Sequence, residues 1–386
     1  MSGTAADRGQ AAIWRVHGAP LVPPLARGSL DGLTVAVKDL FAVAGFPVGA
    51  GNPAWLREAA PETADAAAVH ALRAAGAALA GIAHTDELAF SLSGTNVHYG
   101  TPPNAAAPDR VPGGSTSGPA AAVAAGAADI GLGTDTAGSI RVPAAACRLF
   151  GLRPTHGAVA MSGVLPLAPS FDTVGWLARD PGALARIGDV LLPAASPTHP
   201  TRLAHFDPLP PGAAELARAL DLALVPLPVS GHLDRDALLS AFRTVQSAEA
   251  WATHGGWIAA HPGALGADVE ARFRFGAGVS EDARTVAAAQ IAQARTAFLT
   301  SLDGAWLVLP VGPAHPRDAD AATKDAWRMA TLRETVIASA FGLPSCVLPL
   351  QSDPPAGLAI VGPPGADRAL LTAARLAGAP ATSGVR

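Results

Sequence analysis

The chain has 386 residues, of which 49% are hydrophobic and 15% are charged, enough to build a large folded core. Its formal net charge is −4 and it has no long basic run, which argues against nucleic acid or an anionic membrane as a partner. No apolar run suggests a membrane span and the N-terminus lacks the apolar stretch of a secretory signal, so we expect a cytoplasmic protein. Cys147 and Cys346 lie in apolar surroundings and are predicted to be buried free thiols.

In chain order, the sequence predicts strands alternating with helices. Strands are expected at 33–38, 77–83, 129–133, 305–311, 345–350 and 358–361. Helices are expected at 63–75, 85–92, 120–128, 139–147, 181–192, 236–260, 281–302, 324–341 and 367–376. Irregular chain is expected at 1–30, 93–108, 150–180 and 196–235, the last as a variable insertion. This alternation predicts an α/β fold with helices on both faces of a sheet, and no linker divides the chain.

The stretch 112–143 contains two Gly/Ser-rich turns, each with a serine at the edge of an apolar element. Ser115 lies in Gly-Gly-Ser-Thr-Ser-Gly before the first predicted helix, and Ser139 follows Asp-Thr-Ala-Gly before the second. A positioned hydroxyl beside free backbone N–H groups suits nucleophilic catalysis. An ordinary helix cap is the alternative for either serine, and an anion-binding turn is a further alternative for Ser115.

Lysine is rare in this chain. Only Lys38 and Lys324 occur among the 27 basic residues, and the others are arginine. A lysine kept at Lys38, at the end of an apolar strand, suggests a need for a proton that can leave at neutral pH. A buried lysine has its pKa lowered by desolvation and can act as a base. A surface lysine whose stem packs on apolar residues is the alternative.

Other catalytic classes lack their sequence patterns. The 11 histidines show no paired metal-ligand spacing, so we expect no metal site and no cofactor. No Gly-x-Ser-x-Gly elbow occurs, and no Ser-x-x-Lys occurs because positions 35 and 321 are Val and Ala. The backbone N–H groups of Thr136, Ala137, Gly138 and Ser139 are predicted to form an oxyanion hole.

These motifs resemble the amidase signature family. The family's two serine motifs correspond to residues 113–119, Gly-Gly-Ser-Thr-Ser-Gly-Pro, and 133–141, Gly-Thr-Asp-Thr-Ala-Gly-Ser-Ile-Arg. The separation of the two serines, 139 − 115 = 24, and the strand Ala-Val-Lys-Asp at 36–39 also resemble it. The likeness extends through 150–157, 170–175 and 361–365, and is strongest to the short branch that contains plant-type indole-3-acetamide hydrolases.

The resemblance implies roles for these residues. Ser139 would be the nucleophile, Ser115 the bridging serine after a cis peptide bond from Gly114, and Lys38 the general base and acid. Asp135, Arg141, Thr116 and Gly114 would support them, and Asp172 would act in a similar way to Asp135. A plain surface ion pair is the alternative for Asp135 and Arg141. Thr116, Pro119, Ala137 and Arg148 depart from the family pattern, at positions where Ser, Ser, Gly and Gly are usual.

The resemblance further implies one amidase domain over 1–386, with the amidase signature fold, a mixed central sheet covered by helices on both faces. Its signature core would span about 31–180, a more helical variable region about 181–304, and a C-terminal sheet and helix part about 305–386. The expected reaction is hydrolysis of a small amide, such as an aryl or indole acetamide, by a monomer or homodimer. A subunit of an amidotransferase or of an amide- or carbamate-degrading complex, and a non-catalytic interaction module, are the alternatives.

The substrate pocket is expected between three segments, 93–104, 161–176 and parts of 251–345. Five aromatic residues are candidates to face an aryl group: Trp251, Trp257, Phe273, Phe275 and Trp327. The alternative is that they are core aromatics, because large apolar side chains are mostly buried.

Overall fold

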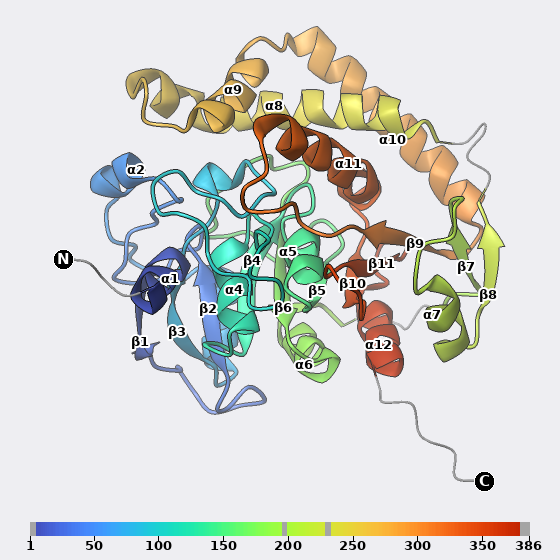
Figure 1. Ribbon diagram of the computed structural model, residues 1–386, viewed down its shortest axis with the longest axis horizontal. Helices are drawn as coiled ribbons and strands as arrows, with labels where there is room; N and C mark the ends of the chain where they lie inside the picture. Colours follow the sequence, from blue (N-terminus) through green and yellow to red (C-terminus); the bar gives the residue numbers. More distant parts are fainter. Residues whose placement is uncertain (1–4, 195–198, 228–232, 379–386) are drawn as a thin grey trace.

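The computed structural model describes residues 5–194, 199–227 and 233–378. Within them, strands from all parts of the chain form one mixed sheet (Figure 1). The strands are β1 (Trp14–Val22), β2 (Thr34–Lys38), β3 (Ala78–Ala83), β4 (Ile130–Asp135), β5 (Phe150–Arg153), β6 (Thr173–Ala178), β7 (Arg202–His205), β8 (Ala223–Pro226), β9 (Trp306–Val311), β10 (Ser345–Pro349) and β11 (Gly357–Val361). Their order across the sheet is β1-β3-β2-β4-β6-β5-β10-β11-β9-β7-β8.

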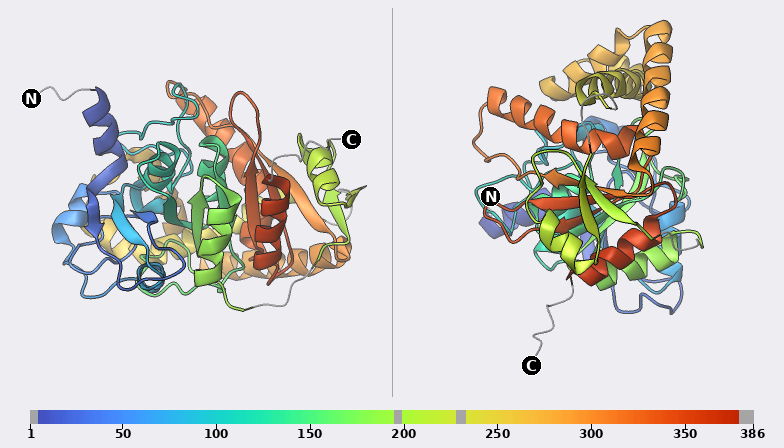
Figure 2. Two further views of the ribbon diagram at one scale, coloured as in Figure 1. Left: turned by 90° about the horizontal axis from the view of Figure 1, so that it is seen from below. Right: turned by 90° about the vertical axis from the view of Figure 1, so that its right-hand side faces the viewer.

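Helices surround this sheet. They are α1 (Ala5–Ile13), α2 (Pro53–Glu58), α3 (Ala67–Ala74), the 3₁₀ turn η1 (Glu87–Ala89), α4 (Ser117–Ala124), α5 (Arg141–Ala146), α6 (Pro181–Leu191), α7 (Ala213–Ala219), α8 (Arg235–Ala260), α9 (Ala267–Ala277), α10 (Glu281–Leu302), α11 (Ala321–Ala340) and α12 (Asp367–Gly378). Helices α8, α9 and α10 form a group at the top of Figure 1 and of the right-hand view of Figure 2.

Helices cover both faces of the sheet centre. On one face, Ala144 of α5 lies against Gly151 of β5. On the other, Trp176 of β6 packs near Gly188 of α6, which also contacts Leu371 of α12. The α/β fold with helices on both faces is therefore confirmed.

Strands β2, β3 and β4 form a deeply buried part of the sheet. Strand β2 pairs in parallel with both β3 and β4. Val35, Ala36, Val37, Ile130 and Leu132 have exposed fractions of 0%, which is usual for strands covered on both faces. The sequence predicted β2 and β3 to within a residue, because short and mostly apolar runs without alternation indicate buried strands.

Most of the long helices agree with the sequence. Helix α10 has the predicted bounds, and α6, α8, α11 and α12 each lie within a few residues of theirs. Helix α6 begins after Asp180, whose side chain accepts from the Ala183 N–H, and has Pro181 in its first turn. These start signals can be read from sequence, which is why such helices are found reliably.

The expectation of an irregular segment at 1–30 is wrong for residues 5–22, whereas residues 23–30 have neither helix nor strand, as expected. Residues 5–13 form α1. Strand β1 then pairs antiparallel with β3. The strand contains Gly18 and Pro20 and its register shifts twice, so its sequence lacks the regular alternation of a strand. Residues 1–4 lie outside the described part of the chain.

The segments 150–180 and 196–235 are also more regular than predicted. Two strands, β5 and β6, form the ends of the first, while its Pro- and Gly-rich middle is a loop. The second contains β7, α7 and β8, and its residues 196–198 and 228–232 lie outside the described ranges. Short strands beside prolines and glycines give little periodic signal.

The predicted helix at 85–92 is wrong, because only the 3₁₀ turn η1 forms there. Leu88 and Ala89 have φ values of 46° and 59°, which a right-handed helix cannot accommodate. Conversely, α2 and α9 were not predicted. Helix α2 has a readable start, since Asn52 caps it through Ala54 N and Trp55 N.

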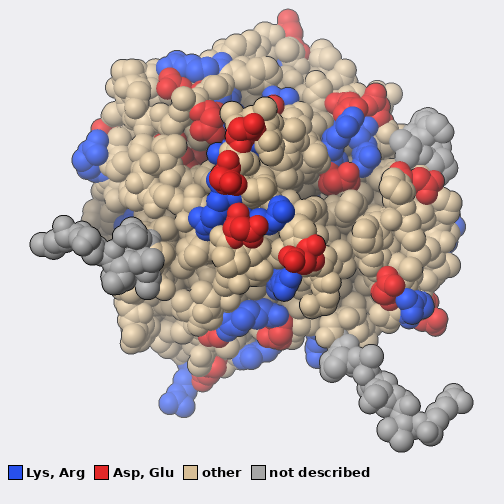
Figure 3. Space-filling view, in the orientation of Figure 1, with Lys and Arg blue, Asp and Glu red and all other residues tan. Residues whose placement is uncertain are grey.

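Both cysteines are buried and free, as predicted. In the part of the chain that the structure describes, no helix has the length and apolar character needed to cross a bilayer. On the face shown in Figure 3, basic and acidic side chains are interspersed rather than gathered by sign.

Candidate active site

The candidate site lies where two neighbouring parallel strands end. Lys38 is the last residue of β2 and Asp135 the last of β4, and these strands pair in parallel. The carboxyl ends of parallel strands are the usual place for ligands in α/β proteins. The turn that carries Ser115 and the loop that carries Ser139 meet at this edge, because the Thr116 N–H donates to the Ser139 carbonyl oxygen at 3.3 Å.

Lys38 is fully buried and contacts two hydroxyls. Its Nζ lies 2.9 Å from Ser115 Oγ and 2.8 Å from Thr134 Oγ1. Burial lowers the pKa of Lys38 to about 7, against the opposing charges of Asp86, Asp135 and Asp172. The structure therefore excludes a surface lysine at this position.

The turn before α4 places Ser115. The peptide bond between Gly114 and Ser115 is cis, as the resemblance implies. Gly114 is required because a Cβ there would lie 2.4 Å from Asp86 Oδ2. Its neighbour Thr116 donates its hydroxyl to the Thr134 carbonyl oxygen at 3.2 Å, so the serine-to-threonine departure keeps a hydrogen bond. Ser115 itself is fully buried.

Ser139 lies in the loop between β4 and α5, with an exposed fraction of 3%. Helix α5 begins at Arg141 after the cap residue Ile140, so Ser139 is not the helix cap. Thr116, not Ser115, is the cap residue of α4. Both capping alternatives from the sequence are thus excluded, and each serine is free of that role.

Asp135 holds the loop of Ser139 in shape. Its Oδ1 accepts from Gly138 N at 2.9 Å and Arg141 Nη2 at 2.8 Å, and its Oδ2 accepts from Ile140 N at 3.1 Å. Arg153 adds an ion pair of 3.1 Å. Burial would raise the pKa of this carboxyl, but Arg141 and Arg153 outweigh burial and hold the pKa well below its usual range. Asp135 and Arg141 therefore support the loop.

The predicted oxyanion hole needs one revision. The N–H of Gly138 donates to Asp135 Oδ1 and is not available to a substrate in this conformation. Thr136, Ala137 and Ser139 remain candidate donors. Ala137 has no positive φ, so the glycine-to-alanine departure does not strain the backbone. Arg148 does have a positive φ of 54°, which accounts for the glycine usual there.

Helix α11 also contacts this loop. Thr335 Oγ1 donates to the Ala137 carbonyl oxygen at 2.6 Å, and Arg141 Nη1 donates to the Thr335 carbonyl oxygen at 2.7 Å. Arg141 Nη2 also donates to Ser339 Oγ at 2.7 Å. The C-terminal part of the chain therefore braces the loop that the signature motif supplies.

Two buried residues near Lys38 were not singled out from sequence. Thr134 contacts Lys38 directly. Asp86 accepts from Gly94 N at 2.9 Å and Ser117 Oγ at 3.0 Å, and its pKa is raised by burial. Thr134 lies inside the second serine motif, so its place at the strand end was a usable signal. Asp86 had none, because its partners come together only in the fold.

Asp172, the residue just before β6, also supports the site. It was named from sequence as a residue of the same supporting kind as Asp135. Its carboxylate accepts from Thr136 Oγ1 at 2.6 Å and from Leu167 N at 2.8 Å. These bonds tie the Ser139 loop to the segment before β6.

A narrow cavity lies next to Ser139. Its volume is ≈ 10 Å³, about the space of one water molecule. The lining residues are Ala89, Phe90, Ser91, Leu92, Thr136, Ala137, Ser139, Leu167, Gln246, Arg328 and Leu332. The predicted segments 161–176 and 251–345 contribute to this wall, whereas 93–104 does not. Gln246 and Arg328 were not predicted.

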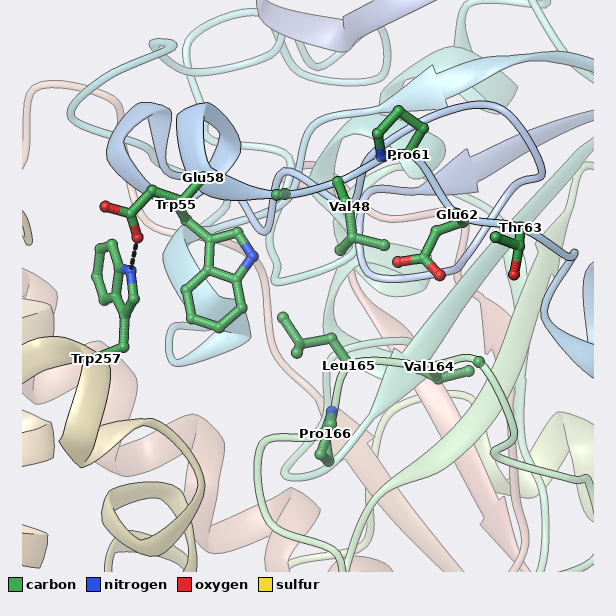
Figure 4. A pocket seen from close by; sticks show the side chains of 13 residues that line it. Val48, Trp55, Glu58, Pro61, Glu62, Thr63, Val164, Leu165, Pro166 and Trp257 are labelled. Atoms are coloured by element: carbon green, nitrogen blue, oxygen red, sulfur yellow. Dashed lines mark hydrogen bonds between the residues drawn. The ribbon is translucent and has the colours of Figure 1, made fainter.

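The five predicted aromatics do not line this cavity. Phe273 is fully buried against Phe90, and Phe275 is exposed. Trp257 lines a separate pocket of ≈ 550 Å³ (Figure 4). There Trp55 lies near Trp257, whose Nε1 donates to Glu58 at 3.0 Å. Leu165 and Pro166, which directly precede Leu167 of the first cavity, form the opposite wall.

No group of three or more His, Cys, Asp or Glu side chains suited to a metal ion occurs among the described residues. The groups that do meet at the candidate site are hydroxyls, backbone amides and a lysine, which suit acid–base and nucleophilic chemistry.

Comparison with known proteins shows which family and which relatives the chain resembles. Residues 23–209 match the model of the family described as Amidase. Amidase 1 of rice, Oryza sativa subsp. japonica, is 55% identical over 171 residues, which are 44% of this chain and 39% of that protein. The 2-amino-5-chloromuconic acid deaminase of Comamonas testosteroni is 35% identical, over 89% of this chain and 80% of the deaminase.

The fold is also similar to that of a solved amidase structure. A solved amidase crystal structure superposes with a TM-score of 0.81 at 27% identity, over 96% of this chain and 92% of that one. The chain belongs to the amidase signature family. Within the family it is similar to Amidase 1 proteins of plants, although the alignment covers less than half of the length of those relatives.

Proposed function

We propose that this protein hydrolyses a small carboxylic acid amide through an acyl-enzyme on Ser139. The observation that carries the proposal is the buried contact of 2.9 Å between Lys38 Nζ and Ser115 Oγ, at a lysine whose pKa burial lowers to about 7. At that pKa a substantial fraction of Lys38 is neutral near pH 7, and a neutral amine can accept the Ser115 proton.

The proposed reaction proceeds in two halves. Ser139 Oγ attacks the amide carbon while its proton passes to Ser115, whose own proton passes to Lys38. The N–H groups of Thr136, Ala137 and Ser139 are the proposed donors to the oxyanion. The protons return along the same path to the departing amine. Water then attacks the ester carbon, and the same residues take its proton and return a proton to Ser139.

The test is ammonia release from indole-3-acetamide, benzamide and short aliphatic amides by the purified chain. We expect Ser139→Ala to remove measurable turnover, and Ser115→Ala and Lys38→Ala to lower kcat by at least about 10²-fold, the usual range for loss of acid–base catalysis. The matched controls are Ser240→Ala, an exposed serine of α8, and Lys324→Ala, the second lysine. Both should retain wild-type activity.

A covalent probe gives a second readout. A sulfonyl fluoride should add to Ser139, detected by peptide mass, and should add more slowly in Lys38→Ala. Full amide turnover by Ser139→Ala, or labelling of another serine, contradicts the assignment of the nucleophile.

Deamination of an amino-substituted acid is the second candidate. It is favoured by the Comamonas testosteroni relative, which is named a 2-amino-5-chloromuconic acid deaminase and aligns with most of this chain. Ammonia release from 2-aminomuconate but from none of the simple amides would select it. Activity that appears only after a partner chain is added would instead select a role as a subunit of a larger amidase complex.

A further inference from the structure

The cavity beside Ser139 contains one charged side chain. Of its lining residues, Arg328 alone carries a charge, and the others are apolar or neutral polar. Arg328 extends from α11 and is partly buried. A guanidinium removed from water is costly unless it meets an anion or several hydrogen-bond acceptors.

Arg328 has no such partner in the described residues. Nearby ion pairs join Arg272 to Asp268 within α9, and Arg333 of α11 to Asp236 of α8. Arg328 forms no ion pair or hydrogen bond with any described residue. Burial, together with the positive charges of Arg272 and Arg243, lowers the pKa of Arg328 to about 9, against the weaker opposition of Asp325 and Asp268. The surroundings of this guanidinium are therefore short of negative charge.

The position of Arg328 relates it to the reacting bond. It lines the same cavity as Ser139, Thr136 and Ala137, the proposed nucleophile and oxyanion donors. A substrate carbonyl at Ser139 therefore places the rest of its acyl chain within this wall. Since Arg328 is the longest side chain of the wall, its movement is the simplest way to enlarge a cavity of ≈ 10 Å³.

We propose that Arg328 binds a carboxylate on the acyl part of the substrate, so that the preferred substrates are half-amides of short dicarboxylic acids. The planar guanidinium suits a carboxylate through two parallel N–H···O bonds. Gln246, in the same wall, provides an amide that can donate a further hydrogen bond. This inference rests on the proposed amide hydrolysis and names its substrate class.

The first experiment compares isosteric pairs. Oxamic, malonamic, succinamic and glutaramic acids are assayed against their neutral diamides, with rates corrected for the two equivalent amides of each diamide. Wild type should favour at least one half-amide over its diamide in kcat/KM by roughly tenfold to hundredfold, the range of a charge-assisted hydrogen bond. Arg328→Gln should remove that preference, mainly through KM.

The control is Arg333→Gln on the same helix, which removes an equal charge whose partner is Asp236 outside the cavity. It should keep the preference. Arg328→Lys should keep part of the preference, because lysine retains the positive charge but cannot donate two parallel hydrogen bonds to a carboxylate. An unchanged preference in Arg328→Gln, or none in wild type, overturns the proposal.

The second experiment does not need turnover. Binding of succinate, glutarate and inorganic phosphate to Ser139→Ala is measured by calorimetry, with and without Arg328→Gln, after the fold of each variant is checked by circular dichroism. Dicarboxylate binding that weakens about tenfold or more without Arg328 supports the proposal even if no amide is hydrolysed. Dicarboxylate binding that is absent or unaffected by the variant, or binding of phosphate alone, contradicts it. Absence of turnover with every amide contradicts the hydrolysis instead.

Discussion

Lys38 is the residue on which the proposed chemistry depends. Because burial lowers its pKa to about 7, the neutral form that can accept a proton becomes dominant above that pH. We expect kcat/KM to rise with pH through an apparent pKa near 7 and then to level off. A pH–rate profile of the purified chain measures this. A profile that is flat between pH 5 and pH 9, with turnover intact, would remove Lys38 as the base.

The same burial has a consequence for stability. Below pH 7 Lys38 is protonated in both the folded and the unfolded chain, and the cost of burying the charge is fully present. Between pH 7 and the ordinary lysine pKa of 10.5 the unfolded chain binds more protons, so the stability of the wild type rises with pH. Lys38→Met should therefore raise the free energy of unfolding more at pH 6 than at pH 10. Urea denaturation at both values checks the sign.

At the scale of residues, sequence was informative where a motif was local. Lys38, Ser115, Ser139 and their glycine-rich turns could be named because each lies within a few residues of its own signal. Asp86 could not, because it meets Ser117 and Gly94 only after β3 and α4 have packed. The Gly138 amide was misassigned because its partner Asp135 depends on the loop's conformation.

At the scale of elements, the junction of β4 and α5 is held by a buried charge cluster. Asp135 faces Arg141 and Arg153, and all three are almost fully inaccessible to solvent. Removing one partner of such a group leaves an uncompensated buried charge, at a cost of about 3–5 kcal/mol. Asp135→Asn should therefore lower the free energy of unfolding by that order and reduce turnover.

The matched comparison is Glu215→Gln, which breaks an exposed pair between Glu215 and Arg218 in α7. A surface pair of this kind contributes about 0–1 kcal/mol. Both variants are measured in urea under the same conditions. Equal losses in the two variants would show that the Asp135 cluster contributes no more than a surface pair.

Elements differed in how well sequence defined them. Helices such as α6 and α10 carry cap residues and long apolar periodicity, so their bounds could be predicted. Strands β5 and β7 have four residues each and could not, because so short a run fits a loop equally well. Pairing with longer neighbours, rather than local preference, forms them.

At the scale of the whole molecule, the sheet joins the two halves of the chain. Strand β10 pairs with β5, and β9 with β7, so the C-terminal strands lie within the sheet rather than beside it. We therefore expect one unfolding transition, with circular dichroism and tryptophan fluorescence giving the same midpoint. Two separated transitions would contradict the single domain proposed for 1–386.

Different parts of the chain supply the proposed catalytic residues and part of the cavity wall. The signature motifs supply Lys38, Ser115 and Ser139, and this part carries the match to the family model at 23–209. Gln246, Arg328 and Leu332 come from α8 and α11, beyond that match. Sequence could identify the family from the first part. It could not identify the cavity wall, which is built by helices that pack there only in the fold.

The two buried cysteines offer a way to observe this division in solution. Cys147 follows the C-terminal end of α5, with its Sγ 3.4 Å from the carbonyl oxygen of Pro112, just before the turn that carries Ser115, and Cys346 lies in β10 at the join of the halves. Burial raises the pKa of both thiols to about 12, so neither reacts while the fold is closed. The rate of alkylation of each thiol therefore reports how readily the structure opens around that cysteine. A Cys147 that reacts first would mean that the end of α5 and the segment before Ser115 open independently of the sheet.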